Sequence, residues 1–223
     1  QGLRRIRQGI TPPGLLALFE VAGRNPQTAN PFDLGFAVGP SLNAAGRLAD
    51  MSLGIQLLLC DDPKIALEIA QELDRINRER RVIESGMQES ALAHLTHLNT
   101  DERPALCLWN PNWHQGVVGI VASRLKERFN RPAIIFAPAE GVDGEALLRG
   151  SGRSIAGYHL RDALDLVSKR KPSLIQKFGG HAMAAGLTIR QADFGFFEES
   201  FLQVSRELLN DDLLQRRCIH DGE

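Results

Sequence analysis

Four short segments of the chain combine glycine with residues that can bind an anion. Glycine lets a backbone approach a ligand closely, and an arginine guanidinium can bind two phosphate oxygens at once. These residue types therefore predict contacts to phosphate groups. The segments are Asn43-Ala44-Ala45-Gly46-Arg47, Trp113 to Gly119 followed by Ser123-Arg124, Gly150-Ser151-Gly152-Arg153-Ser154, and Phe178 to Gly186.

The first two segments each allow a structural interpretation as well. By itself, the segment that ends in Arg47 is better explained as a tight turn with a surface arginine. The segment around His114 leads from a strand into a helix, and the free N–H groups of a helix start attract anions. His114 would add a hydrogen-bond donor there. The alternative is an ordinary helix start with Trp113 in the core, and the sequence leaves both open.

The third and fourth segments are richer in glycine. Two glycines, two hydroxyls and Arg153 predict a cradle of backbone N–H groups for phosphate, with a hairpin or bulge as the alternative. The glycine spacing fits neither a dinucleotide-binding motif nor a P-loop, which excludes a nucleotide cofactor. In the fourth segment, Gly179 and Gly180 predict that His181 lies at the mouth of a short helix of small residues, where it could hydrogen-bond a phosphate or a metal-bound group.

Composition excludes several classes of protein. The sequence has no HExxH motif, no zinc-binding spacing of Cys and His, and no cluster of Asp with His. Its three cysteines, Cys60, Cys107 and Cys218, are far apart and odd in number, which favours a reducing compartment such as the cytoplasm. No signal peptide and no apolar run of membrane-spanning length is present.

Charge and hydrophobic periodicity indicate how the segments are positioned. The net charge is −1, yet eleven Lys and Arg stand against six Asp and Glu from Gly119 to Phe178, which predicts a local basic face. Apolar residues recur every three or four positions from Pro63 to Leu98, which predicts one connector helix of about 54 Å. Two helices with a break near Ser85-Gly86 are the alternative. The acids of this stretch, such as Glu72, are expected on a solvated face.

Strands and helices alternate after Pro104, which predicts a small α/β layer domain. Ahead of the connector, a helix over Gly14 to Ala22 and a strand over Leu34 to Val38 are expected. After Pro104 the expected strands are Ala105 to Trp109, Pro132 to Ala137, Ala146 to Ser151 and Leu187 to Ile189, and the expected helices are Gly116 to Arg128, His159 to Lys169 and Phe194 to Leu209.

In their order along the chain, the four segments resemble the RecJ family, the single-strand-specific exonucleases of the DHH phosphoesterase superfamily. The matching stretches are GPSLNAAGRL, WHQGVVGIVASRLKERF, GSGRSI and KFGGHAMAAGL. The resemblance implies an α/β fold made of the end of a DHH lobe, a long connector helix and a small mixed α/β DHH-associated domain. It divides the chain at 1–60, 61–100, 101–210 and 211–223, the last being the start of a further domain.

The resemblance also implies roles for individual residues. His181 would reach the scissile region from the DHH-associated domain, and the substrate would be bound by Asn43, Arg47, His114, Arg124, Ser151, Arg153, Ser154, Gly179 and Gly180. Many relatives carry a basic residue where this chain has Ser41, which puts one phosphate contact in doubt.

The activity implied by the resemblance is 5′→3′ hydrolysis of single-stranded DNA in recombination and repair. Mn²⁺ or Mg²⁺ would be held by a preceding lobe with an Asp-His-His signature, which this sequence lacks, so the chain is expected to be an inactive fragment that binds no metal itself. Single-stranded DNA, single-strand-binding protein and a repair helicase are the implied partners. A phosphodiesterase for short oligonucleotides and a non-catalytic DNA-binding module remain alternatives.

Overall fold

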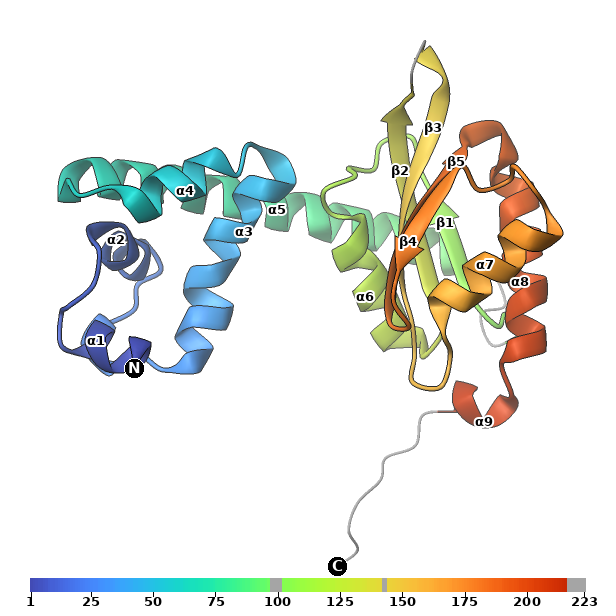
Figure 1. The fold of residues 1–223 in the computed structure, drawn as a ribbon, viewed down its shortest axis with the longest axis horizontal. Helices are drawn as coiled ribbons and strands as arrows, with labels where there is room; N and C mark the ends of the chain where they lie inside the picture. Colours follow the sequence, from blue (N-terminus) through green and yellow to red (C-terminus); the bar gives the residue numbers. More distant parts are fainter. Residues whose placement is uncertain (97–101, 142–143, 216–223) are drawn as a thin grey trace, which may run out of the picture. The chain divides into compact units, whose positions relative to one another are not determined.

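A computed structural model describes residues 1–96, 102–141 and 144–215 of the chain. The chain divides into two compact units, Gln1–Ile83 and Glu84–Glu223. The boundary between them falls inside one long helix (Figure 1). The first unit is helical and the second contains a mixed sheet, so the predicted α/β class is confirmed. The finer four-part division remains a prediction.

The N-terminal unit has its own apolar core among short helices. Pro13 stands in the first turn of α2, where its missing N–H costs no hydrogen bond. Leu18, Phe19, Leu57 and Leu73 are fully buried in its core. The elements are α1 (Gly2–Arg7), α2 (Pro13–Val21), η1 (Pro26–Thr28), η2 (Asp33–Val38), α3 (Gly39–Leu48), α4 (Ser52–Leu59) and the first part of α5 (Pro63–Thr96).

The strand expected over Leu34 to Val38 is wrong, because η2 is a π-helical turn that continues into α3. Asn30 and Asp33 explain the helix start: each side chain accepts a hydrogen bond from the other's backbone N–H, at 3.1 and 3.0 Å. This reciprocal arrangement is a capping box. A short apolar run does not distinguish a strand from a buried helix, and the cap decides between them here. The tight turn favoured for the segment before Arg47 is likewise replaced by helix α3.

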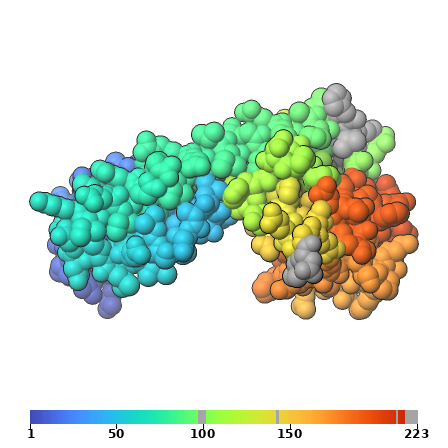
Figure 2. Space-filling model, turned by 90° about the horizontal axis from the view of Figure 1, so that it is seen from above, coloured from blue at the N-terminus to red at the C-terminus, as the bar shows by residue number. Residues whose placement is uncertain are grey.

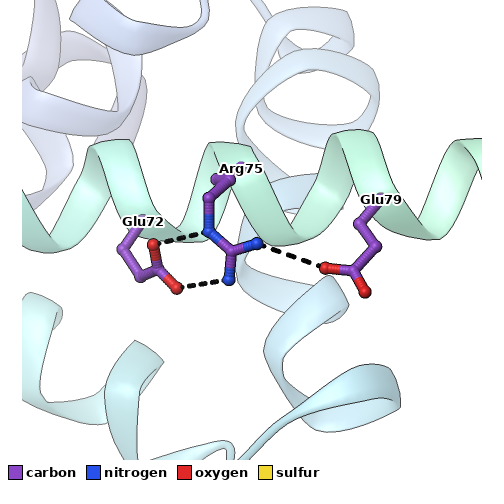
Figure 3. Close-up of polar contacts among 3 residues, drawn as sticks. All are labelled: Glu72, Arg75 and Glu79. Atoms are coloured by element: carbon purple, nitrogen blue, oxygen red, sulfur yellow. Dashed lines mark hydrogen bonds and ion pairs between the residues drawn. The ribbon is translucent and has the colours of Figure 1, made fainter.

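Helix α5 is continuous over 34 residues, so the alternative with a break near Ser85-Gly86 is excluded. Its length is about 51 Å at the usual rise per residue. Figure 3 shows Arg75 between Glu72 and Glu79, with ion pairs of 2.7 and 3.3 Å. Hydrogen bonds from Arg75 lower the pKa of Glu72. These side chains are exposed, and α5 is uncovered along one face in Figure 2, which confirms the predicted solvated face.

The C-terminal unit is built on a five-stranded sheet of order β1-β2-β3-β5-β4, in which only the β1–β2 pair is parallel among the described residues. Figure 1 shows α6 on one face of the sheet and α7 and α8 on the other. The elements are β1 (Leu106–Trp109), α6 (Val118–Phe129), β2 (Ala133–Glu140), β3 (Ala146–Arg153), α7 (Leu160–Arg170), β4 (Lys177–Gly180), β5 (Ala184–Arg190), η4 (Gln191–Asp193), α8 (Phe194–Leu208) and α9 (Asp211–Leu214).

The short helix expected after Gly180 is also wrong, because β4 and β5 form an antiparallel hairpin. Ala185, Leu187 and Ile189 are buried at every second position, which is the period of a strand. Small residues weaken the apolar contrast on which the period of a strand depends, which is why the sequence pattern predicts a helix here. The strands and helices that the sequence predicts elsewhere in this unit are present within a few residues of the predicted bounds, whereas η4 and α9 were not predicted.

Burial of Cys107 in β1 predicts a pH effect on stability. Desolvation, and then the charge of Glu198, raise the pKa of its thiol, while Arg103 lowers it in part. A folded pKa above the unfolded value, about 8.5 for a cysteine, means that stability is complete below this pH and is lost as the pH rises further. We expect the free energy of unfolding, measured in urea, to fall between about pH 8 and 9.5. Cys107→Ala should flatten this fall, and a Cys107→Ala protein with an unchanged slope would contradict it. Cys60→Ala is the control, since Cys60 is only partly buried.

Candidate phosphate-binding face

Strand β3 turns three polar residues, Arg149, Ser151 and Arg153, toward one face of the sheet. The residues between them, Gly150 and Gly152, are buried on the other face. A Cβ on Gly150 would lie 2.5 Å from the ring of Phe136, and one on Gly152 would lie 2.7 Å from Leu160 Cδ2. These two glycines therefore allow close packing in the core. The predicted backbone cradle is wrong, because β3 pairs with β2 on one side and β5 on the other, and its N–H groups belong to the sheet.

The side chains of β3, rather than its backbone, form the polar surface. Arg153 Nη1 donates to Ser151 Oγ at 3.0 Å and to the carbonyl of Gly152 at 2.8 Å. A Cβ on Gly119, in the first turn of α6, would lie 2.9 Å from Arg153 Nη2 and 3.0 Å from Ser151 Oγ. The structure thus brings the second and third segments together, with Gly119 leaving room for the guanidinium.

Around the start of α6, His114 and Trp113 have separate roles. The backbone N–H of Gly116 donates to His114 Nδ1 at 3.0 Å, which leaves Nε2 as the protonated donor of the neutral ring. Trp113 is buried, and its Nε1 donates to Ser90 Oγ at 3.3 Å. The alternative interpretation of Trp113 as a core residue is confirmed. Anion binding at this helix start stays a prediction.

The glycines of the β4–β5 hairpin differ in what they do. Gly180 has φ +149°, and a Cβ there would lie 2.4 Å from the carbonyl oxygen of Ala184, so the fold itself requires glycine. Gly179 and Gly186 stand opposite each other, and a Cβ on Gly179 would meet no atom of the described chain within 4 Å. Space above Gly179 is therefore open to a ligand. His181 is exposed in the turn after β4, with its backbone N–H donating to Ala184 at 2.8 Å.

A pocket of about 390 Å³ lies on this face, above the glycines of β4 and β5. Its polar lining includes four residues that are not among the predicted site residues: Gln115, Arg149, Lys177 and Thr188. The strand register could have indicated the last three, since Arg149 pairs with Thr188, and Thr188 pairs with Lys177. Directly paired residues project from the same face of a sheet. Glycine and arginine motifs alone carry no such information.

Of the predicted site residues of this unit, Ser151 and Gly179 line the pocket, whereas Ser154 and Arg124 make other contacts. Ser154 is only 1% exposed, and its hydroxyl donates to the carbonyl of Tyr158 at 2.7 Å, so it supports the turn after β3. Arg124 is exposed on α6 but is paired with Glu84 at 3.5 Å and Glu127 at 3.9 Å. A phosphate would have to compete with these carboxylates for the Arg124 guanidinium.

The remaining predicted residues lie in the N-terminal unit. Asn43 and Arg47 are exposed and one turn apart on α3, so they share a face of that helix. Ser41 is buried, and Asn77 Nδ2 donates to its hydroxyl at 3.4 Å. A serine at this position therefore contacts α5 within the unit.

The described ranges are residues 1–96, 102–141 and 144–215. In these ranges no three His, Cys, Asp or Glu side chains gather as a metal ion would require. In the same ranges, no helix combines the length and the apolar character needed to span a bilayer.

Comparison with known proteins relates this chain to a domain family and to named relatives. Residues 102–211 match the family model of the DHHA1 domain. RecJ of Salmonella typhimurium and RecJ of Escherichia coli, both named single-stranded-DNA-specific exonucleases, are each 51% identical over 100% of this chain. The chain spans 38% of the length of these two relatives.

Solved structures agree with the sequence matches. The crystal structure of RecJ from Thermus thermophilus in complex with Mn²⁺ superimposes with a TM-score of 0.79 at 30% identity, over 94% of this chain and 29% of that one. Its complex with Mg²⁺ gives a TM-score of 0.78. The family match and the fold thus define a protein with a DHHA1 domain. Given the identity along its whole length, the chain belongs to the RecJ family.

Proposed function

We propose that this chain supplies substrate binding to a metal-dependent exonuclease that hydrolyses single-stranded DNA in the 5′→3′ direction during recombination and repair. The observation that carries the proposal is the open sheet face, where Ser151 and Arg153 lie beside the glycine pair Gly179 and Gly186. A hydroxyl, a guanidinium and an uncrowded backbone suit a phosphate group. Such contacts hold a strand without reading its bases.

Other parts of the proposal rest on family resemblance. Asn43, Arg47 and Arg124 would contact further phosphates, while His114 and His181 would add hydrogen bonds near the cleavage point. Gly180 would shape the turn that presents His181. Mn²⁺ or Mg²⁺, the ions named for the Thermus structures, would be held outside this chain. Single-strand-binding protein and a repair helicase are proposed partners, and the cytoplasm is the proposed location.

The activity is tested with a protein in which this chain follows a metal-binding lobe. We expect Mn²⁺-dependent release of mononucleotides from the 5′ end of a long single strand, with duplex DNA resistant. Faster cleavage of a dinucleotide than of the long strand would instead indicate a phosphodiesterase for short oligonucleotides. Binding of the strand without any hydrolysis would indicate a non-catalytic DNA-binding module.

Gly179→Ala tests whether a ligand occupies the open space above the glycine pair Gly179 and Gly186. The added methyl meets no atom of the described chain within 4 Å, so folding should be unchanged. On the proposed face it occupies space that a phosphate needs, and we expect affinity for a 5′-phosphorylated single strand to fall about tenfold, or about 1.4 kcal/mol. Fluorescence anisotropy measures this.

Gly195→Ala is the matched control for Gly179→Ala. A Cβ on Gly195 also meets no atom of the described chain within 4 Å, but Gly195 stands on α8, which covers the other face of the sheet (Figure 1). Its affinity for the strand should stay at the wild-type value. Equal affinities of the Gly179→Ala and Gly195→Ala proteins would count against a ligand above the glycine pair.

A further inference from the structure

Two cations on the open face lie in one row across the sheet. Arg149 of β3 pairs with Thr188 of β5, and Thr188 pairs in turn with Lys177 of β4. All three line the pocket, and the two cations are exposed. A hydroxyl group therefore stands between a guanidinium and an ammonium group on the same surface.

Neither cation is neutralised by an acid among the described residues. Arg149 and Lys177 have no carboxylate within 4.0 Å in the part of the chain that the structure describes. Other cations of this unit do have one: Arg103 faces Glu198 at 2.7 Å, and Lys169 faces Asp165 at 2.6 Å. The row through Thr188 thus keeps positive charge that an anion can use.

Gln115 orients Arg149 without neutralising it. Its Oε1 accepts a hydrogen bond from Arg149 Nη1 at 3.1 Å. Gln115 lies four residues before Gly119, where the absence of a side chain leaves room for the Arg153 guanidinium. The segment that leads into α6 therefore hydrogen-bonds one guanidinium group, that of Arg149, and leaves space for the other. An amide acceptor uses one of the five N–H groups of Arg149 and leaves its charge intact.

The row through Thr188 is distinct from the position of Arg153. Arg149 and Arg153 are four residues apart on β3, which is roughly 13 Å along a strand. Between them runs the row of Ser151, Gly186 and Gly179. One phosphate group at Ser151 and Arg153 leaves the row of Arg149 and Lys177 available for another.

We propose that Arg149 and Lys177 form a second phosphate subsite, which binds an internal phosphodiester of the strand whose neighbouring phosphate is bound at Ser151 and Arg153. Thr188 supplies a hydroxyl between the two cations, and Gln115 is a positioning residue. This subsite rests on the proposed function of the face. It serves ligands with several phosphates and contributes nothing to a ligand with one.

The test compares 5′-phosphorylated thymidine ligands of one and six nucleotides, labelled at the 3′ end, by fluorescence anisotropy over a salt series with the 223-residue chain. We expect the double substitution Arg149→Gln and Lys177→Gln to lower the affinity for the hexanucleotide at least tenfold. The affinity for the mononucleotide should stay unchanged. The subsite binds one phosphodiester, so its loss should lower the salt slope by about 0.7, the value for each phosphate of a single strand.

Three further variants of the chain distinguish between the possible explanations of a loss in affinity. Arg149→Lys with Lys177→Arg keeps both charges and should bind the hexanucleotide within about twofold of wild type. Arg161→Gln with Lys171→Gln removes two exposed charges from α7 and its C-terminal end and should change neither affinity nor slope. Arg153→Ala reports on the proposed function by itself.

Two results would overturn the subsite. One is a wild-type salt slope in the double glutamine protein while Arg153→Ala loses affinity, which leaves the proposed function standing. The other is equal weakening of mononucleotide and hexanucleotide, which would mean that the two cations act on the first phosphate. If wild type binds neither ligand in a salt-dependent way, both the subsite and the proposed face fail.

Discussion

Replacing Arg153 by alanine is expected to weaken binding of a 5′-phosphorylated single strand by ten- to a hundredfold. Arg153 donates to Ser151 and lies against the first turn of α6, so its guanidinium is already positioned before a ligand arrives. A hydrogen bond to a charged group contributes roughly 1.5–3 kcal/mol. That range converts to the stated loss in affinity. Fluorescence anisotropy at low salt measures it.

Arg161→Ala is the matched control for Arg153. It removes the same charge from α7, which covers the opposite face of the sheet (Figure 1). Its affinity should stay within twofold of wild type. Equal losses from the two substitutions would mean that net charge, rather than this face, determines binding, and the role of Arg153 would be rejected.

Phe197→Ala should destabilise the chain by about 3–5 kcal/mol, the usual cost of deleting a buried phenylalanine ring. Phe197 is fully buried on α8, with its ring centroid 5.4 Å from that of Phe136 and 5.9 Å from that of Phe201. This aromatic cluster joins α8 to the sheet face opposite the pocket. Urea unfolding followed by circular dichroism gives the free energy.

The neighbouring residue provides the control for Phe197. Phe196 is 68% exposed on the same helix, so Phe196→Ala removes an equal ring with little burial. We expect it to change stability by less than about 0.5 kcal/mol, as is usual for surface substitutions. Similar effects of the two substitutions would show that α8 does not pack through Phe197.

The regular elements were largely predictable from periodicity. Helix α5 repeats apolar residues every three to four positions for nine turns, and no short-range signal competes with it. β2 is a continuous buried run of β-branched and aromatic residues, which is typical of an interior strand. In both cases one pattern extends over the whole element.

Local exceptions to periodicity caused the two errors of fold. At η2 the run from Leu34 to Val38 is too short to show a helical period, and the deciding signal is the pair Asn30 and Asp33 just before it. At β5 the small side chains of Ala184 and Gly186 conceal the alternation. This segment forms a strand because it pairs with β3, and a pairing partner that is distant in sequence cannot be recognised from local sequence alone.

For the site, motif composition indicated the chemistry but not the geometry. The segment that contains Gly150 and Gly152 was predicted to form a backbone cradle for phosphate, whereas in the structure these two glycines pack closely against Phe136 and Leu160. Arg149 and Lys177 were missed because a lone cation on a strand carries no motif. Their relation follows from sheet register, which depends on contacts between residues 28 positions apart along the chain.

The most direct test of the central claim, that the open sheet face binds phosphates of a single strand, is mapping of backbone amide NMR shifts. Isotope-labelled chain is titrated with a 5′-phosphorylated hexathymidylate at low salt. The largest shifts are expected at Gly119, Ser151, Arg153 and Gly179, with α7 and α8 unaffected. Shifts concentrated on α7 and α8, with those four amides unchanged, would contradict the assignment of this face.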